Sequence, residues 1–205
     1  MCFTLFCPSL SGHFLKAFAF AATALALAAT SANGQGQVVG WGSNSYGQST
    51  SPISWLLPFT QVSTGMHSAG ILADGSVVCW GYNFANPAWN QCIVPADLGA
   101  VTQVATGKQH TVALRTDGTV RCWGLNTSGC TTVPSGLGTV KQVAAGDTYS
   151  LAIRQDGSLA CWGSNGVGQC TVPIDLGVVT HVAAGYDHTV ALKADGSVRC
   201  WGQHT

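Results

Sequence analysis

A tryptophan–glycine pair recurs along the chain at a nearly constant interval, and this repeat limits the fold more than any other feature of the sequence. The five pairs are separated by 39, 43, 39 and 39 residues. An Asp-Gly dipeptide precedes each of the last four pairs at a fixed distance. A period of this length indicates one supersecondary unit that is copied several times, with neighbouring copies stacked on one another. The five tryptophans are Trp41, Trp80, Trp123, Trp162 and Trp201.

One unit reads approximately VTQVAAGxxHTVALxxDGSVxCWGxNxxGQCxVPxxLG. QVAAG, HTVAL and the run ending at the tryptophan are rich in strand formers, and the Asp-Gly dipeptide suits a two-residue hairpin turn. The stretch CTVP predicts a short fourth strand, whose proline suits a sheet edge. A sheet of this size cannot bury both faces alone, so the units must stack, with the tryptophans as wedges between them. The pattern therefore predicts an all-β fold, a β-propeller of four-stranded antiparallel blades with about four blades present.

The GxxH[ST]xAL, DG, CWGxNxxGQ and VP elements resemble the repeats of the regulator-of-chromosome-condensation family over residues 38–205. The resemblance implies a seven-bladed propeller, and the compact blades ending in GQxxVP are most similar to a bacterial secreted branch that includes a β-lactamase inhibitor protein. Residues 38–48 and 198–205 occupy the same phase of the repeat. We therefore expect an incomplete ring, truncated at the C-terminus. The alternative is an open arc that closes by self-association through its open blade edges.

The first 32 residues differ in kind from the repeats. Residues 17–29 form an apolar run that follows Lys16, and small residues come next. The run is too short to span a bilayer, and the pattern is typical of a secretory signal peptide. We predict a signal peptide at residues 1–32, a repeat region at 33–205, and a secreted or periplasmic protein without membrane insertion after cleavage.

The charge of the chain argues against two classes of partner. It carries 8 basic and 8 acidic residues, and all of the acidic residues are aspartates. A nucleic-acid binder needs a basic stripe, and a protein that binds anionic membranes needs a polybasic segment. Neither is present in the sequence, so no nucleic-acid partner is expected.

The cysteines recur at two places in the unit, one before the tryptophan and one after the following loop. The unit of Trp41 has Gly40 and Ser49 at these places, so both cysteines are absent together. The two places fall on adjacent antiparallel strands, at a separation that suits a disulfide. No CxxC pair offers a zinc site, and we expect no metal and no cofactor. The predicted disulfides are Cys79–Cys92, Cys122–Cys130, which needs a bulge to align, and Cys161–Cys170, with Cys200 left over.

Candidate catalytic residues are few. His67, His110 and His188 each stand seven residues before an Asp-Gly turn, as Tyr149 does in the remaining unit. A residue that recurs in each unit is interpreted as structural, bonding to nearby backbone. Among the carboxylates only Asp147 and Asp187 are individual choices, and no motif pairs them for acid–base chemistry. We predict no enzyme activity, and a carbohydrate-active propeller enzyme is the alternative.

The loops of one rim vary from unit to unit, whereas the strands below them do not. A constant frame under variable loops is how a scaffold presents a binding surface, and aromatic side chains are common interface hot spots. We predict an exported noncatalytic scaffold that binds an unidentified protein, and an inhibitor of a secreted or periplasmic enzyme such as a β-lactamase is the alternative. The predicted partner-binding residues are Tyr46, Tyr82, Phe84, Trp89, Lys108, Gln109, Asp147, Tyr186 and Asp187.

Overall fold

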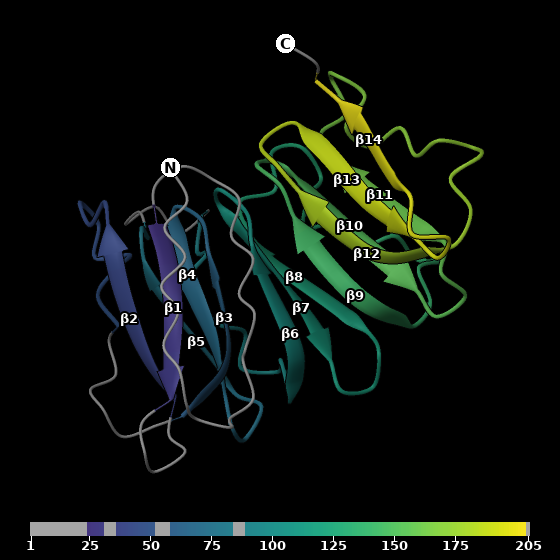
Figure 1. Ribbon diagram of the computed structural model, residues 1–205. Helices are drawn as coiled ribbons and strands as arrows, with labels where there is room; N and C mark the ends of the chain where they lie inside the picture. Colours follow the sequence, from purple (N-terminus) through teal and green to yellow (C-terminus); the bar gives the residue numbers. More distant parts are fainter. Residues whose placement is uncertain (1–23, 31–35, 52–57, 84–88, 204–205) are drawn as a thin grey trace, which may run out of the picture.

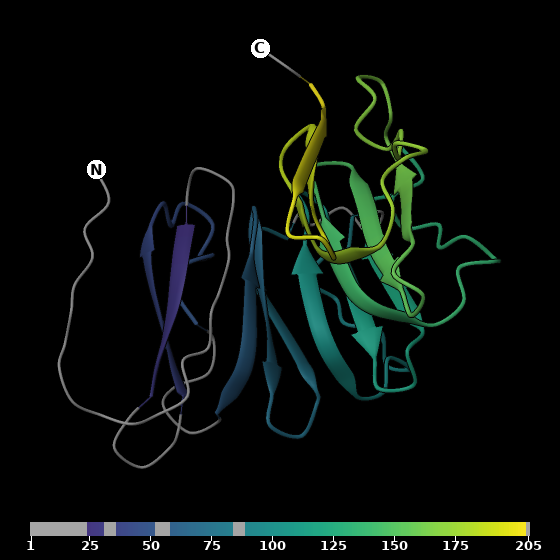
Figure 2. The same ribbon diagram turned by 45° about the vertical axis from the view of Figure 1, so that its right-hand side comes forward.

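The computed structural model describes residues 24–30, 36–51, 58–83 and 89–203. Every regular element among these residues is a β-strand. Strands β1 (Ala24–Thr30) and β2 (Gly36–Gly42) form a two-stranded sheet, and the remaining strands form four three-stranded antiparallel sheets. The sheets follow one another in chain order along an open arc (Figures 1 and 2). The predicted β-propeller of about four blades is confirmed.

Each blade is a meander of three consecutive strands with the second strand in the middle. The first strands of neighbouring blades contact one another, so they line the inner side of the arc. Blade 1 consists of β3 (Phe59–Thr64), β4 (His67–Leu72) and β5 (Val77–Gly81). Blade 2 consists of β6 (Val101–Thr106), β7 (His110–Arg115) and β8 (Val120–Gly124). Blade 3 consists of β9 (Val140–Ala145), β10 (Tyr149–Arg154) and β11 (Leu159–Gly163). Blade 4 consists of β12 (Val179–Ala184), β13 (His188–Lys193) and β14 (Val198–Gly202).

The prediction of a fourth strand in each blade is wrong. The segments 92–95, 131–134 and 170–173 have no ladder partner and continue as turns and extended chain. Their amides are used inside the loop instead, because Ile93 donates to Asn90, Thr132 to Gly129 and Val172 to Cys170. The prolines that follow carry no N–H for a ladder.

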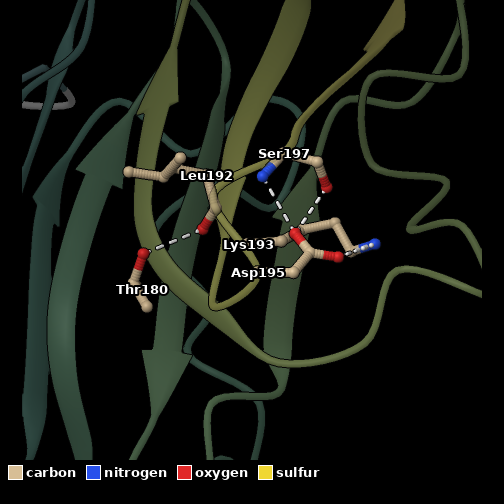
Figure 3. Close-up of polar contacts among 5 residues, drawn as sticks. All are labelled: Thr180, Leu192, Lys193, Asp195 and Ser197. Atoms are coloured by element: carbon tan, nitrogen blue, oxygen red, sulfur yellow. Dashed lines mark hydrogen bonds and ion pairs between the residues drawn. The ribbon is translucent and has the colours of Figure 1, made fainter.

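The Asp-Gly hairpins form where they were predicted, but each loop has three residues instead of two. In blade 1 the Gly75 amide donates to the Leu72 carbonyl and the Leu72 amide to the Ser76 carbonyl, both at 2.9 Å. Gly75 has φ +82°, which closes the bulge that such three-residue loops contain. In blade 4 the Asp195 carboxylate accepts bonds from the Ser197 amide (2.9 Å) and hydroxyl (2.6 Å), as Figure 3 shows. These bonds hold the pKa of Asp195 at about 2.

Four of the five repeated tryptophans lie between blades, as predicted, whereas Trp41 is 44% exposed. Trp80, Trp123, Trp162 and Trp201 are 7 to 8% exposed, and each packs on apolar side chains of the preceding unit. Each indole N–H donates to a main-chain carbonyl 32 residues earlier, and a serine or threonine hydroxyl from the second strand donates to the same carbonyl from 20 residues away, at 2.8 to 3.1 Å. We call this arrangement the blade junction. The accepting carbonyls belong to Gln48, Gln91, Cys130 and Gln169, and the hydroxyls to Ser68, Thr111, Ser150 and Thr189.

A glutamine in the first strand adds a second link between blades. The Gln61 side chain donates to the Val104 carbonyl at 3.1 Å and accepts from the Val104 amide at 2.8 Å. Gln142 makes the same pair of bonds with Val182, and Gln103 accepts from the amide of Val143. A primary amide suits this place because it offers a donor and an acceptor to one peptide unit.

The N-terminal strands occupy the places of a blade's second and third strands. In β1, Leu25 lies opposite Trp41, just as Ser68 lies opposite Trp80 in blade 1. Strand β1 falls within the predicted signal peptide, so cleavage near Ala32 would separate it from β2. Among the described residues no helix is long and apolar enough to cross a membrane.

The blade junction predicts a specific stability defect. In Trp162→Phe the Cys130 carbonyl keeps the Ser150 hydroxyl but loses the indole, so the free energy of unfolding should fall by about 1 to 3 kcal/mol in urea denaturation. Trp41→Phe is the matched control, because Trp41 is 44% exposed. It should stay within about 0.5 kcal/mol of the unchanged protein. Equal losses in the two variants would contradict the role of the junction.

Candidate protein-binding rim

Hydrogen bonds between loops divide the blades into two rims. The GxxH loop of a blade bonds to its NxxGQ loop, since Leu125 donates to Gln109 and Ser164 to Thr148. The Asp-Gly turns bond instead to the start of the next blade, as Val140 does to Gly118. We call the first edge the loop rim and the second the turn rim. The loop rim is the one whose residues vary.

A recurrent asparagine holds the NxxGQ loops in shape. In blade 2 the Asn126 side chain accepts from the Thr131 amide and donates to the Thr132 hydroxyl, both at 2.9 Å. Asn44 and Asn165 make the equivalent bonds in their own loops. The loops therefore present their outward side chains from a fixed backbone, which lowers the entropic cost of binding.

His67 and His110 contact hydroxyl groups of the next blade, which the predicted bonds to nearby backbone did not include. The His67 Nε2 atom lies 2.7 Å from the Thr111 hydroxyl, and the His110 Nε2 atom lies 3.0 Å from that of Ser150. Both hydroxyls are junction donors of the next blade, so each histidine extends the blade junction. The rings are almost fully buried, and burial lowers the pKa of His67 to about 3 and that of His110 to about 4.

Glycine is needed three residues before the ring that begins the second strand in blades 2 to 4. A Cβ atom on Gly107 would lie 2.3 Å from a carbon of the His110 ring, and one on Gly146 would meet the Tyr149 ring. The AxGxxH pattern therefore records the close approach of a ring to the backbone. The pattern does not indicate a catalytic histidine.

These pKa values predict how stability depends on pH. Both lie below the ordinary value of 6.5, so between pH 6.5 and about 4 the unfolded chain takes up protons that the folded chain does not. The neutral histidines contribute their full stabilisation above pH 6.5. As the pH falls below 6.5, the free energy of unfolding should decrease by about 1.4 kcal/mol per pH unit for each histidine. Urea denaturation from pH 7 to 5 measures this slope. His110→Gln should flatten it, whereas the exposed His188→Gln should not. A slope that is the same in all three proteins would contradict the assignment.

Three charged or aromatic side chains from successive blades meet on the loop rim. The Lys108 ammonium lies 3.6 Å from the Asp147 carboxylate and 3.4 Å from the Tyr186 hydroxyl, over the face of the tyrosine ring. The backbone supports them, because Lys108 donates to the Asp147 carbonyl and Asp147 to the Tyr186 carbonyl. We call these three residues the rim triad. The tyrosine side is open, since Tyr186 is 60% exposed.

The two individual aspartates are held by different partners. The Asp147 side chain is 9% exposed, and burial raises the pKa of its carboxyl, with a further rise from Asp187 that Lys108 opposes. The Asp187 carboxylate accepts a bond from the buried Gln169 amide at 3.2 Å. A glycosidase pair faces one substrate bond across an open site, whereas Asp147 is covered by Lys108 and Tyr186. The arrangement suits recognition better than acid–base chemistry.

The remaining predicted residues are dispersed over the loop rim. Tyr46 is 54% exposed, but Tyr82 is buried and packs edge-on against Tyr46 with ring centroids 4.3 Å apart. The prediction that Tyr82 projects from the rim is therefore wrong, and its role is to support Tyr46. Trp89 and Gln109 are half-buried, and Phe84 lies outside the described residues.

Two features of the rim escaped sequence reasoning. The buried Gln169 donates a hydrogen bond to Asp187, but in the sequence it belongs to the repeated NxxGQ motif and is not predicted as a site residue. The contact of Lys108 with Tyr186 was also missed, although both take the first variable place of the GxxH motif, in blades 2 and 4, on either side of Asp147 in blade 3. Their shared phase was the signal that could have revealed it.

The structure confirms one predicted disulfide. Cys161 and Cys170 are bonded, with Cα atoms 5.2 Å apart. The Cys79–Cys92 and Cys122–Cys130 bridges are not formed in the structure, and Cys200 is an exposed thiol. Burial raises the pKa of all four unbonded thiols of these pairs. Among the described residues no three His, Cys or Asp side chains gather as a metal site would require.

The register of the loop explains why Cys122 and Cys130 are unbonded. The Cys130 carbonyl accepts the Trp162 and Ser150 bonds that Gln169 accepts one blade later. Cys130 therefore stands in the glutamine place, and Thr131 stands where Cys170 stands, with its amide bonded to the preceding asparagine in both cases. The bulge proposed for this pair would break the junction bonds. Cys92 does follow Gln91, in the same register as Cys170.

The register predicts which thiols oxidise. Peptide mapping of non-reduced protein should show Cys161–Cys170 and, under oxidising conditions, Cys79–Cys92, with Cys122 and Cys130 as thiols. Replacing Cys130→Gln together with Thr131→Cys should add a bridge to Cys122, because the new cysteine takes the place that Cys170 has. Thr131→Ser is the control and should add none. A native bridge between Cys122 and Cys130 would contradict this account.

These features define the chain as an open β-propeller with a rigid, variable loop rim. Three successive segments, residues 101–130, 140–169 and 179–205, match the Regulator of chromosome condensation (RCC1) repeat. The segments correspond to blades 2 to 4 with their loops. These three segments of the chain thus resemble RCC1 repeats, which agrees with the resemblance seen in the sequence pattern. No curated protein matches the sequence.

Solved structures share this fold. The ectodomain of the Physcomitrella patens receptor kinase CR4 matches with a TM-score of 0.71 and 25% identity, over 88% of this chain and 50% of that chain. Human WBSCR16 matches with a TM-score of 0.71 and 23% identity over 88% and 59%. Prp20p from Saccharomyces cerevisiae matches with a TM-score of 0.69 and 21% identity over 88% and 56%. The chain thus spans between half and three fifths of the length of these proteins.

Proposed function

We propose that this chain is an exported, noncatalytic propeller scaffold that binds a protein partner through its loop rim. One observation carries the proposal: the same junction bonds recur under loops whose outward residues differ from blade to blade. The rim triad and Tyr46 give this surface exposed aromatic rings beside a cation. Aromatic and cationic side chains of this kind are enriched among interface hot spots.

Similarity to other propellers supports a protein partner. The Prp20p structure is described with its binding properties to Gsp1p and histones, and another yeast RCC1 structure was solved bound to Kap60. Those partners belong to those proteins. For this chain the proposal is limited to a protein partner, and nucleic acid is disfavoured because the sequence has no basic stripe.

Export is supported by three observations. The N-terminal sequence has the pattern of a signal peptide, Cys161 and Cys170 form a disulfide, and the CR4 propeller is an ectodomain. Disulfides persist in oxidising compartments. We therefore propose a secreted or periplasmic location, and the mass of the exported protein would reveal whether it begins near Asn33.

Two narrower forms of this proposal are each supported by a single observation. Inhibition of a secreted or periplasmic enzyme such as a β-lactamase rests on the resemblance of the GQxxVP blades alone, and hydrolysis assays with added protein test it. Self-association through the open blade edges rests on the open arc of the structure. Analytical ultracentrifugation of the exported protein tests this version.

The loop rim makes a testable prediction about partner capture. Immobilised protein is incubated with the extracytoplasmic fraction of its host, and captured proteins are quantified by mass spectrometry. Tyr186→Ala should lower the capture of a specific partner by at least about tenfold, because it removes the exposed ring on the open side of the rim triad. Ile174→Ala is the matched control, since Ile174 is a fully exposed apolar side chain outside the loop rim. Capture that survives Tyr186→Ala together with Tyr46→Ala would contradict the proposal.

A further inference from the structure

A hollow on the turn rim lies between blades 2 and 3. It has a volume of about 400 Å³ and opens on the side of the molecule away from the rim triad. Its walls combine polar and apolar side chains and come mainly from the Asp-Gly turn of blade 2 and from the start of blade 3. The residues used below are Arg115, Thr116, Asp117, Thr139 and Lys141.

Lys141 departs from the repeat at the edge of this hollow. The other three blades have a threonine at the same place in the first strand, and its hydroxyl donates to a carbonyl of the second strand at 3.1 to 3.3 Å. Figure 3 shows this bond between Thr180 and Leu192. Lys141 cannot make it in the same way, and its exposed ammonium has no polar partner among the described residues. The Lys141 side chain therefore does not make the bond that links the first and second strands in the other blades.

Arg115 is the second cation of the hollow, and its bonding is incomplete. Its Nη2 atom donates to the Asp97 carbonyl at 3.1 Å, but its Nε–H is buried without a partner in the described part of the chain. In blade 4 the equivalent Lys193 pairs with Asp195 of its own turn at 3.2 Å (Figure 3). The Asp117 carboxylate lies near Arg115, which lowers the pKa of Asp117 after the larger effect of its bonds from Thr119.

Other cations of the described chain are already matched. Lys108, Arg121 and Lys193 form ion pairs with aspartates, as does Arg199. Arg154 donates to the Leu137 carbonyl and the Ser158 hydroxyl. Two cationic residues, Arg115 and Lys141, line the hollow with one carboxylate residue, Asp117, so the hollow carries a surplus positive charge. Thr116 and Thr139 also line it.

We infer that this hollow is an anion-binding site that takes a small oxyanion, a carboxylate or a phosphate, between Lys141 and Arg115. A guanidinium fork matches the geometry of either anion, and an ammonium adds a point charge. The walls limit the ligand to a small molecule, because a hollow of this volume is at the lower end of the range for ligand pockets. The site is independent of the loop rim and of any partner bound there.

The test is an NMR titration of the complete exported protein at low ionic strength, with inorganic phosphate in one arm and glucuronate in the other. We expect saturable shifts of the amides of Thr116, Gly118 and Lys141 in at least one arm, and the arm that binds identifies the anion. Lys141→Thr restores the residue of the other blades, so it should fold, and it should weaken binding by about tenfold. Arg199→Thr removes the same charge from blade 4, where Arg199 pairs with Asp175, and should leave binding unchanged.

Two results would overturn the inference. One is the absence of saturable shifts in both arms. The other is an equal effect of Lys141→Thr and Arg199→Thr, which would mean that anions respond only to net charge.

Discussion

A single main-chain carbonyl at the end of each NxxGQ loop holds one unit to the next. It accepts an indole N–H and a hydroxyl from the second and third strands of the following blade, so two strands are positioned by one atom. A buried carbonyl without partners costs about 1 to 3 kcal/mol, and each blade therefore depends on its neighbour for satisfied bonds. The buried histidine or tyrosine of the preceding blade completes the junction by contacting the hydroxyl-bearing residue. Stability in such a chain is shared between neighbours, as in other repeat proteins.

This dependence explains which residues are constant and which are free. The constant residues all contact the next or preceding unit. They are the tryptophan, the hydroxyl residue, the ring at the start of the second strand and the glycine shortly before it. Side chains on the outward faces of the loops make no such contacts between units. They are therefore the places where individual residues gather, as in the rim triad on one side and around Lys141 on the other.

Much of the fold followed from the local pattern. The three strands of each blade, the hairpin at each Asp-Gly pair and the burial of four of the five repeated tryptophans agree with the sequence prediction. The fourth strand failed because strand propensity in CTVP competes with turn bonds that satisfy its amides inside the loop. The hydroxyl partners of His67 and His110 lie 44 and 40 residues away, and no local pattern indicates them.

The candidate site was predictable only in outline. The repeat phase identified the variable loops, but it did not reveal that Tyr82 is buried beneath Tyr46 or that Lys108 bridges Asp147 and Tyr186. Exposure and ion pairing depend on which blades are adjacent and on how far each side chain reaches. For the same reason the sequence marks Lys141 only as a departure from threonine, and its lack of a partner is visible only in three dimensions.

The cysteines show the same division most clearly. The sequence alone determined the repeat, the strand order and the pairing of Cys161 with Cys170, because these follow from spacing along one hairpin and its loop. Only the tertiary structure decided that Cys130 takes a glutamine's place, since that place is defined by bonds from Trp162 and Ser150 of the next blade. Spacing within a unit fixes local geometry, whereas register within a loop is set by the neighbour that packs against it.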